Sequence, residues 1–215
     1  MATKPATTDG GRVVLYLALL AGVTYLVPAT VGWTGSDVIA WKGLGVGLLA
    51  LHAATRARSR DGWLLAGVLA AGALGDVLLD AVSLLAGATA FAVGHIIAIV
   101  LYLGNQRSTS TASQTAAALV LASLTPVIAW ALTRRPDVAL YSVLLGIMAA
   151  LAWRSRFPRY RTGIGAAAFV ASDLLIFATM GMIASGPMTG FLIWALYFGG
   201  QALIATGVIA TLSAE

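Results

Sequence analysis

The sequence predicts an all-α membrane protein, a bundle of eight transmembrane helices with both termini on the cytoplasmic side. Three observations support this prediction: the composition of the chain, its long apolar stretches and the distribution of its basic residues. Of the 215 residues, 60% are hydrophobic and 10% are charged. A soluble domain carries about a quarter of its residues as charged side chains. The composition therefore excludes a soluble fold, and the apolar excess excludes a disordered chain.

Eight apolar stretches predict the spans. A transmembrane helix needs about 20 mostly apolar residues. Stretches that meet or nearly meet this requirement lie at about residues 13–32, 38–55, 63–81, 83–104, 114–132, 137–153, 163–184 and 188–211. We therefore expect an N-terminal tail over 1–12, one transmembrane domain over 13–211 and a C-terminal tail over 212–215. We interpret the first stretch as an uncleaved helix, because it is longer than a signal-peptide core and no clear cleavage site follows it; a signal peptide is the alternative.

The basic residues predict the orientation. With a cytoplasmic N-terminus, the outer loops hold only Arg134 and Arg135, and the inner segments hold Lys4, Arg12, Arg56, Arg58, Arg60, Arg107, Arg154, Arg156, Arg159 and Arg161. This bias is typical of cytoplasmic loops, so we expect both termini in the cytoplasm. Contact of these loops with anionic lipid explains the net charge of +5 without nucleic acid, and no nucleic-acid-binding motif accompanies them.

Five ionisable side chains lie inside the predicted spans or at their edges: Lys42, Asp76, Asp80, His95 and Asp173. Insertion of such a residue costs roughly 2.5 to 3.5 kcal/mol, so each marks a candidate functional site. The helical rise places Lys42 and Asp76 about 6 and 7 Å from the outer ends of their helices, and Asp173 and His95 about 16 and 18 Å. The same measure gives depths of about 6, 14 and 20 Å for Tyr141, Tyr197 and Gln201. We therefore expect Asp76, His95 and Asp173 to line one cavity that opens toward the outer side.

Asp76 and Asp80 are four residues apart and share one helical face. Two neighbouring carboxylates in a low dielectric do not both ionise easily, so one would keep a proton near neutral pH, as a general acid requires. Lys42 is the expected compensating cation for Asp76, either in the site or in an ion pair that only joins the second and third spans. His52, near the inner end of the second span, is expected at the interface.

Asp173 lies beside Ser172, near the middle of the seventh predicted span. A buried acid there is either protonated and hydrogen-bonded or charged and paired. His95 is either part of the site or an interhelical hydrogen-bond donor. One histidine and three aspartates could hold a hard cation, but the chain has no cysteine and no metal-binding spacing such as HExxH. We expect no metal and no cofactor.

An ordered set of residues runs through the second to eighth spans: Trp41-Lys42, Leu-Gly-Asp-Val-Leu-Leu at 74–79, Gly94-His95-Ile96, Leu140-Tyr141, Phe-Val-Ala-Ser-Asp at 169–173, and Tyr197 with Gln201. This set resembles the YhhN family of membrane proteins, the bacterial relatives of animal lysoplasmalogenases, over about residues 41–206. The chain departs from the family pattern at Lys42-Gly43, where Lys-Pro is frequent, and Asp80 has no typical counterpart.

The resemblance implies hydrolysis of the vinyl ether bond of a single-chain lysophospholipid, in a bacterial cytoplasmic membrane, to a fatty aldehyde and glycerophosphoethanolamine or glycerophosphocholine. Such a reaction needs an acid and a base. We expect Asp76 and Asp173 to divide these roles, with His95 as a water-orienting or proton-shuttling group. The expected substrate-binding residues are Lys42, Asp80, Tyr141, Ser172, Tyr197 and Gln201. The alternatives are a proton-coupled transporter or channel, and a lipid-binding protein without turnover.

Overall fold

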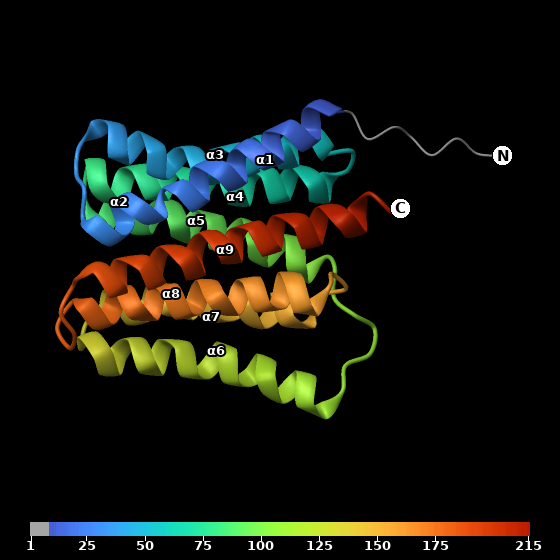
Figure 1. Cartoon of the computed structure of the whole chain (residues 1–215). Helices are drawn as coiled ribbons and strands as arrows, with labels where there is room; N and C mark the ends of the chain where they lie inside the picture. Colours follow the sequence, from blue (N-terminus) through green and yellow to red (C-terminus); the bar gives the residue numbers. More distant parts are fainter. Residues whose placement is uncertain (1–8) are drawn as a thin grey trace.

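The computed structural model describes residues 9–215 and contains eight helical spans (Figure 1). The first span consists of α1 (Asp9–Thr24) and α2 (Leu26–Val31), and the seventh of η1 (Arg159–Gly163) and α8 (Ile164–Thr179). The remaining six spans are α3 (Ser36–Arg56), α4 (Arg60–Ala81), α5 (Leu84–Leu103), α6 (Ala112–Thr133), α7 (Pro136–Arg154) and α9 (Pro187–Leu212). The segment contains no strand, and all eight spans are long and apolar enough to cross a membrane. The prediction of an all-α integral membrane protein is confirmed.

Side-chain caps fix three of the helix starts. Ser59 accepts a hydrogen bond from Gly62 N at the start of α4, and Ser83 accepts one from Ala86 N at the start of α5. Thr111 and Gln114 form a reciprocal capping box at the start of α6. These bonds satisfy backbone donors that have no partner within the helix. The short turns before α4 and α5 make α3, α4 and α5 antiparallel neighbours in sequence order.

The first span is broken at Tyr25, where the sequence predicts a continuous helix. Pro28 causes the break, because its ring has no N–H and clashes with the carbonyl group four residues earlier. The indole Nε1 of Trp194 in α9 donates a 2.6 Å hydrogen bond to Gly22 O, just before the break. The kink therefore makes a backbone carbonyl available to a distant helix.

The seventh span ends at Thr179, five residues before the predicted end at residue 184. The backbone N–H groups of Met182 and Ile183 both turn back to Ala178 O, at 2.8 and 3.0 Å, and this closes the helix. Because the helix ends earlier than predicted, Asp173 lies closer to the outer surface than predicted. Its depth below the outer end of the helix becomes about 9 Å instead of about 16 Å.

The spans form two halves that meet along a seam (Figure 1). In the first half, α1 packs on α3, α3 on α4, and α4 on α5; in the second, α6 packs on α7 and α8 on α9. Across the seam, α5 packs on α7, while α9 packs on α2, α3 and α4. Polar residues on α4, α5, α7, α8 and α9 are brought to this seam.

The two ends of the bundle differ in charge. The start of α1 and the end of α9 lie at one end (Figure 1), which we call the basic end because nine of the ten arginine and lysine residues assigned to the inner side lie there; Lys4 is outside the described residues. Arg134 and Arg135 lie at the opposite end, in the turn between α6 and α7. That the basic end faces the cytoplasm remains a prediction.

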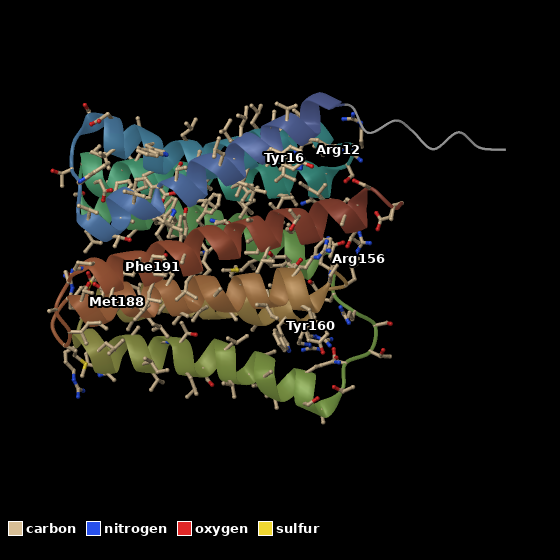
Figure 2. All side chains as sticks on the ribbon, in the orientation of Figure 1. Arg12, Tyr16, Arg156, Tyr160, Met188 and Phe191 are labelled. Carbon is tan, nitrogen blue, oxygen red and sulfur yellow. The ribbon has the colours of Figure 1, made fainter. Side chains whose placement is uncertain are left out.

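Apolar side chains cover the outside of the bundle. Figure 2 shows Tyr16, Met188 and Phe191 projecting from the ribbon, and these side chains are 66%, 68% and 40% exposed. A soluble protein rarely exposes a continuous apolar surface of this kind, whereas lipid covers it in a membrane. Since lipid offers no hydrophobic drive for helix association, the helices rely on close packing. At the α8–α9 crossing, a methyl group on Gly165 would lie 2.6 Å from Gly200 O.

Candidate functional site

Asp76 of α4 is bonded to Tyr197 of α9 across the seam. The Tyr197 hydroxyl group donates a 2.8 Å hydrogen bond to Asp76 Oδ2, and both side chains are buried, with exposed fractions of 5% and 2%. Gly72, one turn before Asp76, makes space for this contact: a methyl group there would lie 2.9 Å from Gln201 Nε2 and 3.3 Å from the Tyr197 hydroxyl oxygen. A larger residue at position 72 would push both α9 side chains away.

Asp173, Tyr141 and His95 form a second bonded group. The Tyr141 hydroxyl group donates to Asp173 Oδ2 at 2.8 Å, and its oxygen lies 3.0 Å from His95 Nε2. Because a phenol has a single proton, His95 Nε2 must donate to Tyr141, which leaves Nδ1 as an acceptor. Three helices, α8, α7 and α5, thus hold a continuous hydrogen-bonded chain.

Aromatic rings contact both groups. The Phe169 ring lies edge-on to His95, with a centroid distance of 5.3 Å, and to Tyr197, at 5.2 Å. Phe91 contacts both Phe169 and Tyr197, at 6.2 and 5.8 Å. Phe169 therefore contacts both groups, and Phe91 and Phe169 form a shared aromatic wall beside them.

A small cavity of about 20 Å³ lies on the seam, which is room for about one water molecule. Its polar lining comes from His95, Tyr102 and Gln201, and apolar side chains that include Met148 and Ile204 line the rest. Gln201 is 2% exposed, and its Oε1 has no hydrogen-bond partner among the residues that the structure describes. A buried carbonyl oxygen without a donor favours an ordered water at this position.

The expectation that Asp76, His95 and Asp173 line one cavity is wrong for this structure. Of the three, only His95 lines the cavity, because each carboxyl group is turned toward a tyrosine of a neighbouring helix. Among residues 9–215, neither carboxyl group is in a salt bridge. Asp173 is nevertheless connected to the cavity through Tyr141 and His95.

The expected pairing of Lys42 with Asp76 is also wrong. Lys42 Nζ lies 2.8 Å from Asp80 Oδ2, one helical turn closer to the opposite end of the bundle. The two side chains are 14% and 36% exposed, so the pair is open to solvent or lipid headgroups, whereas Asp76 lies sealed below it. The pair joins α3 to α4 and leaves Asp76 without a cation partner.

Ser172 and His52 take no part in the two bonded groups or the cavity at the seam. The Ser172 hydroxyl group donates to Ile193 O of α9 at 2.9 Å, with no exposed surface. His52, which was expected at the interface, is 4% exposed and lies close to the basic end, within one turn of the end of α3. Neither residue contacts the cavity.

The sequence analysis did not single out Phe91 and Phe169 as site residues. A spacing signal was present, because Phe91 precedes His95 by four residues and Phe169 precedes Asp173 by four. Residues at this spacing share a helical face. Gly75 supplies a second signal, since a methyl group there would lie 2.9 Å from the Phe91 ring. Within residues 9–215, no three histidine or acidic side chains come together in a group able to hold a metal ion.

Comparison with known proteins identifies the family of the chain. No curated protein and no solved structure gives a significant match. The model of the YhhN family matches residues 38–208, which include α3 to α8 and most of α9 and hence both bonded groups and the cavity. The matched region covers most of the chain, and the chain belongs to the YhhN family.

Proposed function

We propose that the protein is a membrane-embedded lipid hydrolase of the lysoplasmalogenase type. Its substrate would be an alkenyl lysophospholipid, cleaved at the vinyl ether bond to a fatty aldehyde and glycerophosphoethanolamine or glycerophosphocholine. The observation that carries the proposal is the pair of buried carboxyl groups, Asp76 and Asp173, held by separate tyrosines next to a shared aromatic wall. A buried acid without a cation is expensive for a membrane protein, which supports a functional role.

Vinyl ether hydrolysis needs an acid, a base and water, and no covalent nucleophile. A proton is first added to the alkenyl carbon farther from oxygen, and the second alkenyl carbon becomes an oxocarbenium ion. Water adds to this cation and loses a proton to a base, which gives a hemiacetal. The deprotonated acid then takes the proton of the hemiacetal hydroxyl group while the protonated base gives its proton to the glycerol oxygen, and the carbon–oxygen bond breaks to release aldehyde and alcohol. Acid and base both return to their starting states.

The geometry supports a division of roles between the two bonded groups. His95 lines the water-sized cavity, and its Nδ1 is free to accept a proton from water while Tyr141 and Asp173 hold the ring and stabilise the imidazolium that forms. Asp76, in the other bonded group, would then be the acid that protonates carbon. Tyr197 would orient its carboxyl group.

The aromatic wall suits the cationic intermediate. The Phe91 and Phe169 rings contact Tyr197 and His95, which belong to the two bonded groups, and the face of an aromatic ring attracts a cation. The oxocarbenium ion would lie against these rings, close to both carboxyl groups, as in glycoside hydrolysis with two carboxyl groups. The cavity holds no more than about one water, so we expect the lipid to enter sideways along the seam as the helices separate.

The exposed Lys42–Asp80 pair is the proposed headgroup site. Lys42 would exchange Asp80 for the phosphate group of the lysophospholipid, which would place the vinyl ether bond below it, near Asp76. Gln201 and Tyr197 would contact the ether oxygen and the cavity water.

A proton-coupled transporter is the second candidate, because the chain from His95 through Tyr141 to Asp173 has the form of a proton relay. Apolar residues argue against a path through the protein. Beyond His95 toward the basic end, Tyr102 supplies one hydroxyl group to the lining of the cavity, and the side chains around it, such as Val68, Ala98 and Ile204, neither donate nor accept a proton.

The test is an assay of purified protein in detergent with an alkenyl lysophospholipid and its acyl analogue, with aldehyde and fatty acid measured separately. We expect aldehyde from the alkenyl lipid and its loss in Asp76→Asn and in Asp173→Asn. Asp37→Asn, an exposed acid in the first turn of α3, is the matched control and should retain activity. Wild-type protein that releases no aldehyde would contradict the substrate assignment. A proton flux in reconstituted vesicles that is lost in the same two variants would favour transport.

A further inference from the structure

A second pocket, which is polar, lies at the basic end of the bundle and shares no lining residue with the cavity of the proposed site. The loop between α5 and α6 forms it together with the loop that follows α7. The pocket has a volume of about 670 Å³, and every residue that lines it is polar: Arg107, Arg156, Gln106, Gln114 and four consecutive hydroxyl residues at 108–111. No acidic side chain lines it. Its lining therefore offers many hydrogen-bond donors and two positive charges.

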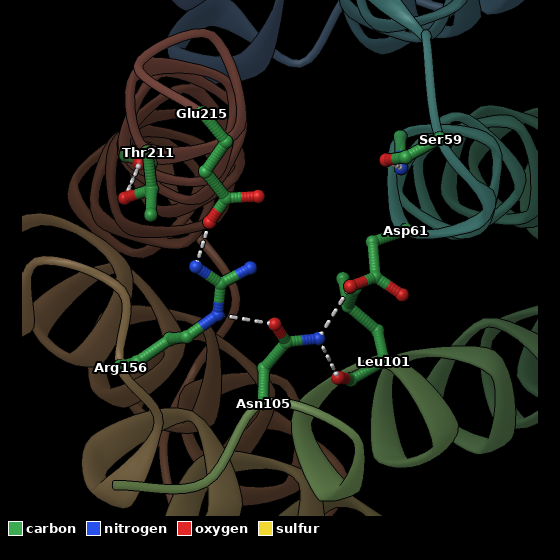
Figure 3. Close-up of polar contacts among 9 residues, drawn as sticks. Ser59, Asp61, Leu101, Asn105, Arg156, Thr211 and Glu215 are labelled. Carbon is green, nitrogen blue, oxygen red and sulfur yellow. Dashed lines mark hydrogen bonds and ion pairs between the residues drawn. The ribbon is translucent and has the colours of Figure 1, made fainter.

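Both arginines of the pocket are held in place by the fold. Arg107 donates from Nε to Ser155 O at 2.6 Å and from Nη2 to Phe157 O at 2.9 Å, so within the described residues its Nη1 has no partner. Arg156 donates from Nε to Asn105 Oδ1 at 2.5 Å and from Nη1 to Glu215, as Figure 3 shows. Its Nη2 likewise has no partner among residues 9–215. Two preorganised guanidinium groups lose little entropy when they bind an anion.

The surroundings have an excess of positive charge and of unused donors. Burial and the neighbouring charge of Arg159 lower the pKa of Arg107. Three buried donor atoms in the adjoining segment have no acceptor among the described residues, namely Trp153 Nε1, Arg154 Nε and Arg159 Nη2. Among the described residues, Glu215 is ion-paired with Arg156 alone, and Asp61 accepts a 2.7 Å hydrogen bond from Asn105 Nδ2 on the side away from the pocket lining. Those three donors lie outside the pocket; within it, an anionic ligand with several acceptor oxygens would supply acceptors to Arg107 Nη1 and Arg156 Nη2.

The position of the pocket favours a lipid over a soluble anion. It lies at the ends of the spans, where Tyr160 is 79% exposed and the arginines gather, which is the level of lipid headgroups. Below the pocket, α6 is the span with the fewest buried residues, since only Ala118, Thr125 and Ala129 are buried. Its exposed apolar side chains, such as Leu119 at 64%, offer a surface for acyl chains.

We propose that this pocket binds the phosphate group of an anionic phospholipid, whose acyl chains lie along α6. The site is separate from the proposed active site, and hydrogen bonds between the α5–α6 loop and the loop after α7 form it before any ligand binds. Ligand binding here requires no turnover, so the proposal stands or falls independently of the hydrolase assignment.

The test uses the full chain in phosphatidylcholine nanodiscs with and without phosphatidylglycerol, and native mass spectrometry counts the lipids that remain bound after release. We expect retention of phosphatidylglycerol over phosphatidylcholine. Thr109→Glu adds a negative charge at an exposed position of the pocket and should weaken retention about fivefold, as expected for one unit of charge at the membrane surface. Thr109→Gln is the neutral control at the same position and should retain the lipid.

Arg107→Gln should weaken retention at least as much as Thr109→Glu. Arg60→Gln, which removes an exposed arginine at the same end but outside the pocket, should have little effect. An equal loss in Arg60→Gln would show that general surface charge explains retention, and would overturn the site. A titration with inorganic phosphate separates the two sources of phosphate: no measurable binding supports the lipid, and tight binding that displaces phosphatidylglycerol would overturn the lipid assignment.

Discussion

The hydroxyl group of Tyr197 donates its hydrogen bond to Asp76 from the last helix of the chain to the third span, a separation of 121 residues. This bond is the only one that the structure gives to the Asp76 carboxyl group within residues 9–215. The orientation of the proposed acid therefore depends on a single phenol that the second half of the bundle supplies.

Tyr197→Phe should lower the rate of aldehyde release by about one to two orders of magnitude, which is part of the roughly 10²- to 10⁴-fold that a positioned acid contributes. It should also reduce the free energy of unfolding by about 1 to 3 kcal/mol, because a buried carboxyl group loses its donor. The measurements are initial rates and thermal unfolding in detergent. Tyr16→Phe, at a lipid-exposed tyrosine, is the control, and an equal effect there would remove the case for a specific role of Tyr197.

Tyr141→Phe should interrupt the path between His95 and Asp173. If these residues act as one relay, Tyr141→Phe and Asp173→Asn should each reduce the rate strongly, and the double variant should be little slower than the worse single variant. Rate constants for the two single variants and the double variant test this point. Effects that multiply would mean that the two residues act independently.

The headgroup assignment of Lys42 predicts a change in substrate affinity rather than in chemistry. Lys42→Gln should raise KM for the lysophospholipid with a smaller change in kcat, because its ammonium group would contact only the phosphate. Asp80→Asn should leave Lys42 free for the substrate and so should not raise KM. A fall in kcat alone in Lys42→Gln would instead place Lys42 close to the reacting bond.

The close crossing of α8 and α9 predicts that alanine substitutions at two glycines have different effects on stability. Gly165→Ala should destabilise the protein by about 1 to 3 kcal/mol, because its new methyl group would lie 2.6 Å from Gly200 O, a backbone atom that can only move with its helix. Gly199→Ala adds a methyl group with nothing within 4 Å and should be neutral or slightly stabilising in a helix. Unfolding temperatures in one detergent compare the two variants. Equal temperatures would show that the crossing relaxes at no cost.

The bond between Arg156 and Glu215 predicts a pH dependence of stability (Figure 3). Hydrogen bonding to Arg156 holds the pKa of Glu215 below its ordinary value of 4.5. The pair therefore stabilises the fold above pH 4.5, and this contribution is lost as the pH falls through the lowered pKa. The effect should be small because Glu215 is exposed. Glu215→Gln should unfold slightly earlier than wild type at neutral pH, and the difference should vanish in acid. A difference that persists in acid would have another cause.

The sequence predicts the spans well because length and apolar composition are local properties. The start of α5 at Leu84, one residue from the predicted boundary, follows from the Ser83 cap. Two features are predicted wrongly, the continuous first span and the end of the seventh span, and hydropathy does not report the cause of either. Pro28 breaks a helix that stays apolar on both sides, and the turn after Ala178 closes α8 while the apolar residues Met182 and Ile183 continue the pattern.

The candidate site is harder to predict because it depends on how helices are placed against one another. Asp76 and Asp80 share one face of α4, and only the vertical offset between α3 and α4 decides that Lys42 reaches Asp80. Similarly, periodicity assigns Tyr141 and Tyr197 to the interior but does not reveal that each bonds a different carboxyl group. The residue types of the site follow from the cost of polar groups in lipid, whereas their pairing follows only from three-dimensional packing.

The break at Tyr25 affects how much of the chain α9 needs in order to hold the proposed acid in place. The family match begins at residue 38, after the first span, yet Trp194 of α9 donates a hydrogen bond to Gly22 O of that span and packs at a tilt against Tyr25, with a centroid distance of 4.4 Å. Trp194 in turn contacts Tyr197, three residues further along α9, at 5.5 Å. The first span thus supports the tyrosine that holds Asp76. A protein reduced to the matched residues would lose this support for its proposed acid.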